Sequence, residues 1–370
     1  MISPPLTPSR LALARKRRGM TLVRLADVTG VSTRSLSAYE SGRQQPTPQT
    51  TRALARALAV PAAFLQGPEI EEIPPGAASF RALSKMTAAQ RDTACSAGRI
   101  AFLISDWIEE RFILPPADVP SLARLDPETA AEVVRTRWGL GQAPVSNVIH
   151  LLESRGVRVF SLAEECAAVD AFSLFWHGTP FAFLNTLKSG ERGRFDGAHE
   201  LGHLVLHSDD RVPRGPDAEQ EANRFAAAFL MPARTVIAAR LAGATVDQIL
   251  AAKSTWNVSA LALTHRLHEL GLLTEWGYRT ACVSLSRLGY RRAEPGGIPR
   301  ETSQLLSKVF RALRDDGIPP RRMARDLAMS VTELNSHVFG LVPTALPGGI
   351  PDGPPLRPQL RLLPSARGGS

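Results

Sequence analysis

The sequence has few cysteines and no long apolar run, and both absences restrict what the protein can be. Only three cysteines occur among 370 residues, Cys95, Cys166 and Cys282, and no two of them are spaced as CxxC. A disulfide-stabilised scaffold and a cysteine metal site are therefore not expected. No run of eighteen uncharged apolar residues is present, so we expect no membrane-spanning helix and no membrane partner.

The N-terminal segment lacks the pattern of a secretory signal. Its first ten residues, MISPPLTPSR, have no apolar region behind a basic residue, so we expect a cytoplasmic, nucleoid-associated protein. The composition, 44% hydrophobic and 21% charged, is typical of globular proteins and excludes a mostly disordered or fibrous chain. The length indicates two or three domains.

Positive charge is distributed unevenly along the chain. The formal net charge is +9, to which residues 1–67 contribute +8, residues 68–280 contribute −5 and residues 281–370 contribute +6. A basic head on an acidic body indicates a polyanion-binding module joined to a part with a different function.

Capping and turn residues predict a bundle of short helices in the basic head. Residues suited to start helices are Ser9, Thr21, Ser32 and Thr47, and residues suited to end them are Gly19, Gly30 and Gly42. The stretch TLVRLADVTGVSTRSLSAYESGRQQP resembles the helix-turn-helix of the lambda-repressor-like (XRE) family. The matching residues are Leu25, Ala26, Gly30, Val31, Ser32, Leu36, Tyr39, Glu40, Ser41, Gly42, Arg43 and Pro46. The resemblance covers about residues 9–67.

This resemblance implies that the third helix enters the major groove of double-stranded operator DNA. The candidate DNA contacts are Thr33, Arg34, Ser37, Arg43 and Lys16. Arg34 can form the bidentate contact to guanine, whereas Arg43 and the basic run 15–18, which includes Lys16, would contact phosphates. A two-fold symmetric operator favours a homodimer.

Helices interspersed with a few strands are predicted after an acidic, proline-containing linker. The predicted helices lie within 80–114, at 128–140 and at 147–153. The predicted strands are 157–160, 171–176 and 180–184, and the last two flank a hairpin turn at 177–179. The predicted fold class is therefore mainly α with a small antiparallel sheet (α+β).

The segment His199-Glu200-Leu201-Gly202-His203 has the pattern HExxH. Four residues make about one helical turn, so both imidazoles project from one face and can hold one Zn²⁺ ion. Glu200 lies beside them and can accept a proton from a water that the metal activates. The residues that follow are apolar, so this helix is expected to be buried, and a metal would explain its buried polar side chains.

A site of this kind needs a third ligand, and Glu219 is the favoured candidate. On the alanine-rich helix that ends at Met231-Pro232, Glu219 shares one small-residue face with Ala222, Asn223 and Ala226. Glu221 lies about 200° around that helix from Glu219, and His207 is rotated about 80° from His199. Both are therefore poorly placed, and Asp209 and Asp210 are further alternatives.

These two segments together resemble the ImmA/IrrE family of zinc metallopeptidases. The resemblance rests on RFDGAHELGHLVLH and the following ExxANxFAAxFLMP, with weaker matches over about residues 80–275. It implies His199, His203 and Glu219 as zinc ligands and Glu200 as the general base. It also implies a substrate class, DNA-binding repressor proteins that are cleaved under stress.

The whole chain resembles longer bacterial regulators in which a helix-turn-helix precedes such a domain. We predict five parts: a DNA-binding domain at 9–67, a linker at 68–79, a metallopeptidase domain at 80–275, a C-terminal helical region at 276–342 and a disordered tail at 343–370. Helices are expected at about 301–315, 319–328 and 331–338. The last 28 residues contain seven prolines and five glycines, a composition that does not support a packed core.

Two functions from different classes compete, and a third, an antitoxin-like partner of another protein, also stays open. In the first, the protein is a DNA-binding regulator that also acts as a zinc-dependent peptidase on a repressor. In the second, the zinc domain is a sensor or structural module without catalysis. The ligands and the base are all present, but no residue that would stabilise an oxyanion can be assigned.

Overall fold

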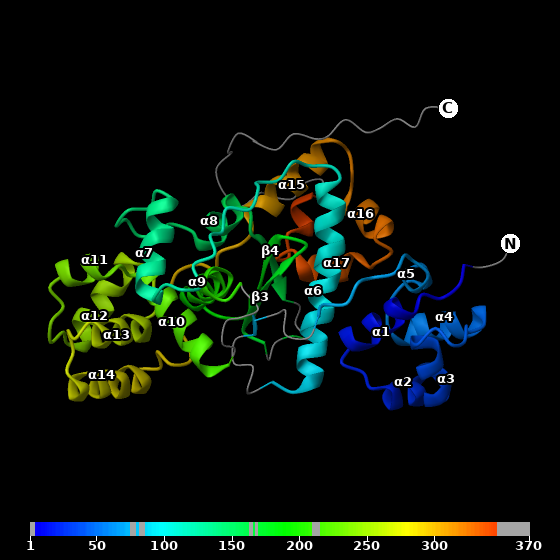
Figure 1. Cartoon of the computed structure of the whole chain (residues 1–370), viewed down its shortest axis with the longest axis horizontal. Helices are drawn as coiled ribbons and strands as arrows, with labels where there is room; N and C mark the ends of the chain where they lie inside the picture. The colour runs from blue at the N-terminus through cyan, green and yellow to red at the C-terminus, as the bar shows by residue number, and fades with distance from the viewer. Residues whose placement is uncertain are drawn as a thin grey trace.

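A computed structural model describes residues 4–74, 79–80, 86–162, 166, 169–208 and 215–345 of the chain (Figure 1). It is mainly helical with one small sheet, which confirms the predicted fold class in its main features. Across these ranges, no helix is both long enough and apolar enough to cross a membrane.

Five short helices form the N-terminal bundle. They are α1 (Pro8–Arg17), α2 (Leu22–Thr29), α3 (Thr33–Glu40), α4 (Pro48–Ala57) and α5 (Ala62–Leu65). The side chains of Thr21 and Ser32 cap α2 and α3 by accepting hydrogen bonds from backbone N–H groups. Gly30 ends α2 with φ of 71°, a left-handed conformation that glycine adopts without strain. Helices α2 and α3, together with the sharp turn between them, form the predicted helix-turn-helix.

The sheet has four strands, and it is mixed. They are β1 (Ser79–Phe80), β2 (Arg158–Leu162), β3 (Ala171–Trp176) and β4 (Thr179–Asn185), in the order β1-β3-β4-β2. The hairpin β3–β4 is antiparallel, as predicted, but β2 pairs with β4 in parallel. The prediction of a purely antiparallel sheet was therefore wrong for this strand. Local residue patterns predict that a segment forms a strand, but not which strand it pairs with or in which direction.

The sheet separates two hydrophobic cores. Alternate side chains of β4 point to opposite faces: Phe181 and Phe183 join one core, and Ala182 and Leu184 join the other. The first core also contains the N-terminal bundle and α6, and the second contains the helices around α9. Because both faces are covered, the strands are mostly apolar, and their polar residues Ser161 and Ser173 are buried as well.

Nine helices of the described chain and one short 3₁₀ helix lie between residues 88 and 287. They are α6 (Ala88–Glu109), α7 (Pro127–Arg137), α8 (Val148–Ser154), α9 (Gly190–Leu206), α10 (Pro216–Leu230), α11 (Ala233–Ala238), α12 (Val246–Ala252), η3 (Lys253–Thr255), α13 (Ala260–Glu269) and α14 (Glu275–Arg287). Of these, α6, α8 and α9 pack against the sheet. Helix α9 packs against β3, β4 and α10. It therefore runs through the centre of the domain (Figure 1).

The C-terminal helices are α15 (Gln304–Asp315), α16 (Pro320–Asp326) and α17 (Val331–His337), followed by η4 (Val342–Ala345). These three helices agree with the predicted positions. Glu153 of α8 accepts hydrogen bonds from the backbone N–H groups at the start of α15, at 3.0 and 2.9 Å. Glu301, just before α15, accepts in turn from the first N–H groups of α8. The N-terminus of each of these two helices is thus capped by a glutamate that lies on or next to the other helix. Most of the predicted tail, residues 346–370, lies outside the described residues.

The described part of the predicted linker, residues 68–74, contacts α6. Ile70 is buried, and its carbonyl oxygen accepts a hydrogen bond from Arg99 of α6 at 2.7 Å. The N-terminal bundle and α6 are therefore held together by more than chain connectivity.

Candidate functional site

Helix α9 brings two histidine side chains to one point. Ser189 caps the helix, and His199 and His203 lie four residues apart on the same face. Both side chains are buried, at 0% and 4% exposure. Their Nε2 atoms are 3.0 Å apart, so both nitrogens are close enough to bind the same ion.

Glu219 of α10 completes a cluster of three possible metal ligands. Its carboxylate oxygens lie 3.6 Å from His199 Nε2 and 3.3 Å from His203 Nε2. Ligand atoms about 2.0–2.1 Å from a tetrahedral zinc ion are about 3.3 Å from one another, so these separations suit one such ion. The chemistry of the donors, two imidazoles and one carboxylate, fits zinc as well.

The alternative third ligands lie elsewhere. His207 Nδ1 is 2.9 Å from His203 Nδ1, so His207 contacts the ring nitrogen that faces away from the cluster. Glu221 lies 2.9 Å from His207 Nε2 and is half exposed. Asp209 and Asp210 lie outside the described residues.

Small residues between α9 and α10 allow the close approach that this cluster requires. A Cβ atom at Gly202 would lie 3.1 Å from the Phe225 ring and 3.2 Å from the Ala222 backbone. Ala222 and Ala226 are fully buried, as expected for the small-residue face. A larger side chain at Gly202 would separate the two helices and move Glu219 away from the histidines.

Each histidine of the cluster has a partner at its other ring nitrogen. Asn223 Oδ1 lies 3.1 Å from His199 Nδ1, and a chain from Glu221 through His207 reaches His203 Nδ1. Partners of this kind fix ring orientation and tautomer in metal sites. Helical spacing placed Asn223 on the face of Glu219, but no role was predicted for it. The i, i+4 spacing of Asn223 from Glu219 was the sequence feature that could have predicted its contact with a ligand histidine.

Glu200 is completely buried next to the histidines. The hydroxyl of Ser173, on β3, donates a hydrogen bond to Glu200 Oε2 at 2.7 Å. This contact fixes the direction of the carboxylate. Sequence reasoning missed Ser173, because it lies on a strand 27 residues away and belongs to no local motif.

The N-terminal bundle presents the first turn of α3 to solvent. Thr33 and Arg34 are exposed and Ser37 is half-buried, while Leu36 on the opposite face is fully buried. Arg43 is exposed after the end of α3, and its Nε donates to Ser41 Oγ at 2.8 Å. Four of the five predicted DNA contacts therefore lie on or next to one helix.

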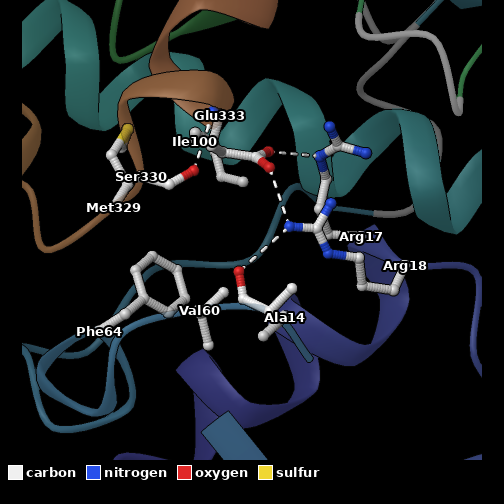
Figure 2. Close-up of a pocket in the computed structure, with 10 residues that line it drawn as sticks. Ala14, Arg17, Arg18, Val60, Phe64, Ile100, Met329, Ser330 and Glu333 are labelled. Carbon is white, nitrogen blue, oxygen red and sulfur yellow. Dashed lines mark hydrogen bonds and ion pairs between the residues drawn. The ribbon is translucent and has the colours of Figure 1, made fainter. Parts of the chain in front are cut away.

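The basic run at the end of α1 is engaged within the protein. Lys16, the fifth predicted contact, is not brought to the α3 face, since its ammonium lies 3.8 Å from Asp92 of α6. Arg15 donates to Glu40 at 2.7 Å. Arg17 and Arg18 both bind Glu333 of α17, at 2.9 and 3.0 Å (Figure 2). The run thus joins the N-terminal bundle to α6 and α17.

Replacing Glu333 by glutamine is expected to destabilise the folded chain by about 3 kcal/mol at neutral pH. Burial raises the pKa of Glu333, but the hydrogen bond from His337 and the charges of Arg17, His337 and Arg18 outweigh it and lower the pKa to about 2. The difference from the ordinary value of 4.5 corresponds to about 3 kcal/mol. Because the folded-state pKa is lowered, this contribution is present above pH 4.5 and is lost as the pH falls toward 2.

Urea denaturation between pH 7 and pH 3 checks this expectation. The exposed Glu275, which pairs with Arg279 one turn away, gives the matched control Glu275→Gln, with an expected effect below about 0.5 kcal/mol. A Glu333→Gln variant as stable as the wild type at pH 7 would contradict the assignment.

Comparison with known families agrees with this geometry. The profile of the IrrE N-terminal-like domain matches residues 152–268, which include the whole candidate metal cluster. The profile of a helix-turn-helix domain matches residues 11–65, which include α2 and α3. No curated protein matches the chain.

Proposed function

Since the chain carries a helix-turn-helix DNA-binding domain and an IrrE N-terminal-like, metallopeptidase-like domain, we propose that it is a transcriptional regulator that is also a zinc-dependent peptidase. One observation carries the proposal: three possible metal ligands converge beside a buried glutamate whose direction is fixed. A site with only a structural role does not need that glutamate.

Zinc would be held by His199, His203 and Glu219, and when bound it would polarise a peptide carbonyl and lower the pKa of an attacking water. Glu200 would accept the proton of that water and later transfer it to the leaving amine. Ser173 keeps the Glu200 carboxylate in place, because its hydroxyl donates to one of the two oxygens. Asn223 and His207 contact the Nδ1 atoms of the two imidazoles and would keep their Nε2 atoms directed toward a bound ion.

We propose a helix-turn-helix repressor protein as the substrate. A peptidase that binds DNA near the repressor's own site meets the repressor at a high effective concentration. The exposed Thr33 and Arg34 at the start of α3 would provide that binding. On a two-fold symmetric operator the protein would act as a homodimer.

The test is incubation of the zinc-loaded protein with repressors encoded next to it, followed by gel electrophoresis and mass spectrometry. We expect one specific cut that a chelator abolishes and added zinc restores. If no repressor is cut, while the protein still binds DNA and controls transcription, the zinc domain is a sensor or structural module.

Arg34→Ala is expected to reduce the preference for operator over random DNA by about 1–3 kcal/mol, because a bidentate contact to guanine would be lost. Arg43→Ala is the control, since a phosphate contact weakens binding to both DNAs equally. Fluorescence anisotropy with both duplexes at one salt concentration measures the difference. Equal losses on the two duplexes for Arg34→Ala would exclude base reading by this residue.

A further inference from the structure

The three C-terminal helices repeat the first three helices of the chain in register. The same interval along the chain separates the first residues of α2 and α16, Leu22 and Pro320, and the first residues of α3 and α17, Thr33 and Val331. It also separates the glycine that follows α1, Gly19, from Gly317, which follows α15. No insertion or deletion is needed over these helices.

The turns of the two units have the same backbone conformation. Gly19 and Gly317 both have positive φ, at 61° and 70°. The turn between the second and third helices contains Gly30 in the first unit and Ala328 in the second, with φ of 71° and 52°. A left-handed alanine is uncommon, so its presence at the position of Gly30 indicates that the surrounding fold imposes this turn.

Caps and core residues also correspond. Ser32 and Ser330 each cap the third helix by accepting from the backbone N–H three residues later, at 3.1 and 3.0 Å. Two pairs of counterparts are fully buried at 0% exposure: Leu25 with Met323, and Leu36 with Leu334. Helices α16 and α17 therefore have the turn, cap and core of a helix-turn-helix, although few residues are identical.

The exposed face of the second unit differs from that of the first. The counterparts of Thr33 and Arg34 are Val331 and Thr332, which are exposed but carry no charge. The counterpart of Ser37 is Asn335, whose Oδ1 accepts a hydrogen bond from Val342 N at 3.0 Å. These side chains do not suit bidentate base reading, because such contacts need a guanidinium or an available amide.

Positive charge is concentrated on α16 instead. Arg321, Arg322 and Arg325 are exposed on this helix, and Arg322 is the counterpart of Arg24 in α2. Arg322 also pairs with Asp326 one turn away at 3.1 Å, an exposed pair of the kind that contributes little and can exchange for a phosphate. The nearby negative charge of Glu333 is balanced by Arg17 and Arg18, as Figure 2 shows, so it opposes a polyanion little. Exposed arginines on the second helix of such a unit are suited to phosphates.

We propose that α15–α17 form a second helix-turn-helix unit, which binds duplex DNA through phosphate contacts of Arg321, Arg322 and Arg325 without reading bases. The chain then holds DNA at two places, one specific and one sequence-independent. The second contact adds affinity and salt dependence but leaves the operator preference to α3.

The test compares the full-length protein with the triple variant Arg321→Ala, Arg322→Ala and Arg325→Ala. Binding to operator and random duplexes is measured by fluorescence anisotropy over a salt series. Each phosphate contact contributes about 0.9 to the slope of log K against log salt, so the slope is expected to decrease by about two to three. Affinity should fall equally on both duplexes, unlike the operator-selective loss expected for Arg34→Ala.

A second triple variant separates the proposal from a general charge effect. Arg124, Arg234 and Arg287 are exposed and are distant in sequence from α16, and α11 and α14 lie far from it in Figure 1. Replacing these three by alanine removes the same charge and should leave the salt slope unchanged. An unchanged slope for the α16 variant, with its circular dichroism and melting temperature intact, would overturn the proposal, as would an equal decrease for the control.

Discussion

Glu200→Gln is expected to slow repressor cleavage by about 10²–10⁴-fold while the protein keeps its metal and its fold. The side chain lies between the two histidines in the sequence but outside the group of possible ligands. Glutamine preserves its size and can still accept the hydrogen bond of Ser173, so packing at this buried position is retained. Only the ability to accept a proton is lost.

The matched comparison is Ser173→Ala, which removes the group that orients Glu200 and leaves the base in place. We expect a smaller loss of rate than for Glu200→Gln, with unchanged zinc content. Single-turnover cleavage, followed by mass spectrometry, provides the rates. If Glu200→Gln cleaves as fast as the wild type, the base lies elsewhere and the proposed mechanism is wrong.

His199→Ala is expected to abolish metal binding and to lower the melting temperature by at least as much as chelation of the wild type, since the substitution also removes a buried side chain. A ligand that binds only the folded state stabilises it by about 4 kcal/mol at a free concentration of 1,000 Kd. Loss of the ion also removes the positive charge that would compensate the desolvation of the two buried imidazoles and the carboxylate, which adds to the destabilisation.

Differential scanning calorimetry with and without chelator checks this expectation. The chelator should shift the wild type and leave His199→Ala unchanged. The control is His265→Ala, which alters a histidine of α13 that contacts Tyr278 and lies outside the metal cluster. An unchanged melting temperature of the wild type on addition of chelator would contradict a metal-stabilised fold.

Local sequence patterns predicted the metal cluster well because its parts follow helical periodicity. The HExxH spacing places His199 and His203 on one face, and the small-residue stripe on α10 selected Glu219 over Glu221. The contacts of Ser173 and His207 were not predicted in the same way. They depend on how β3 and α9 pack and on the exact side-chain directions, which spacing does not encode.

The basic run of α1 shows the limit of reading charge from composition. Arg17 and Arg18 suggested phosphate contacts, but their carboxylate partner, Glu333, is more than 300 residues away in the sequence. Net charge identifies a module that suits a polyanion and cannot show which cations are already paired. The same limit applies to β2, because its pairing with β4 depends on contacts between separate segments of the chain.

The proposed second helix-turn-helix was not predicted from the sequence, because its turn lacks the residue that marks such a turn. Its α16 and α17 keep the apolar positions and the serine cap, but Ala328 replaces the glycine that marks the turn of the first unit. The sequence predicted three helices there without indicating how they pack. Backbone angles and buried positions reveal the correspondence.

The most direct test of the proposed metal centre is the zinc content of the purified protein, measured by native mass spectrometry on the wild type, Glu219→Ala and Glu221→Ala. We predict one zinc ion per chain for the wild type and for Glu221→Ala, and none for Glu219→Ala, since Glu219 alone of the two carboxylates lies within 3.3 and 3.6 Å of the histidine Nε2 atoms. A wild type without metal, or full zinc occupancy in Glu219→Ala together with its loss in Glu221→Ala, would contradict the assignment of this centre.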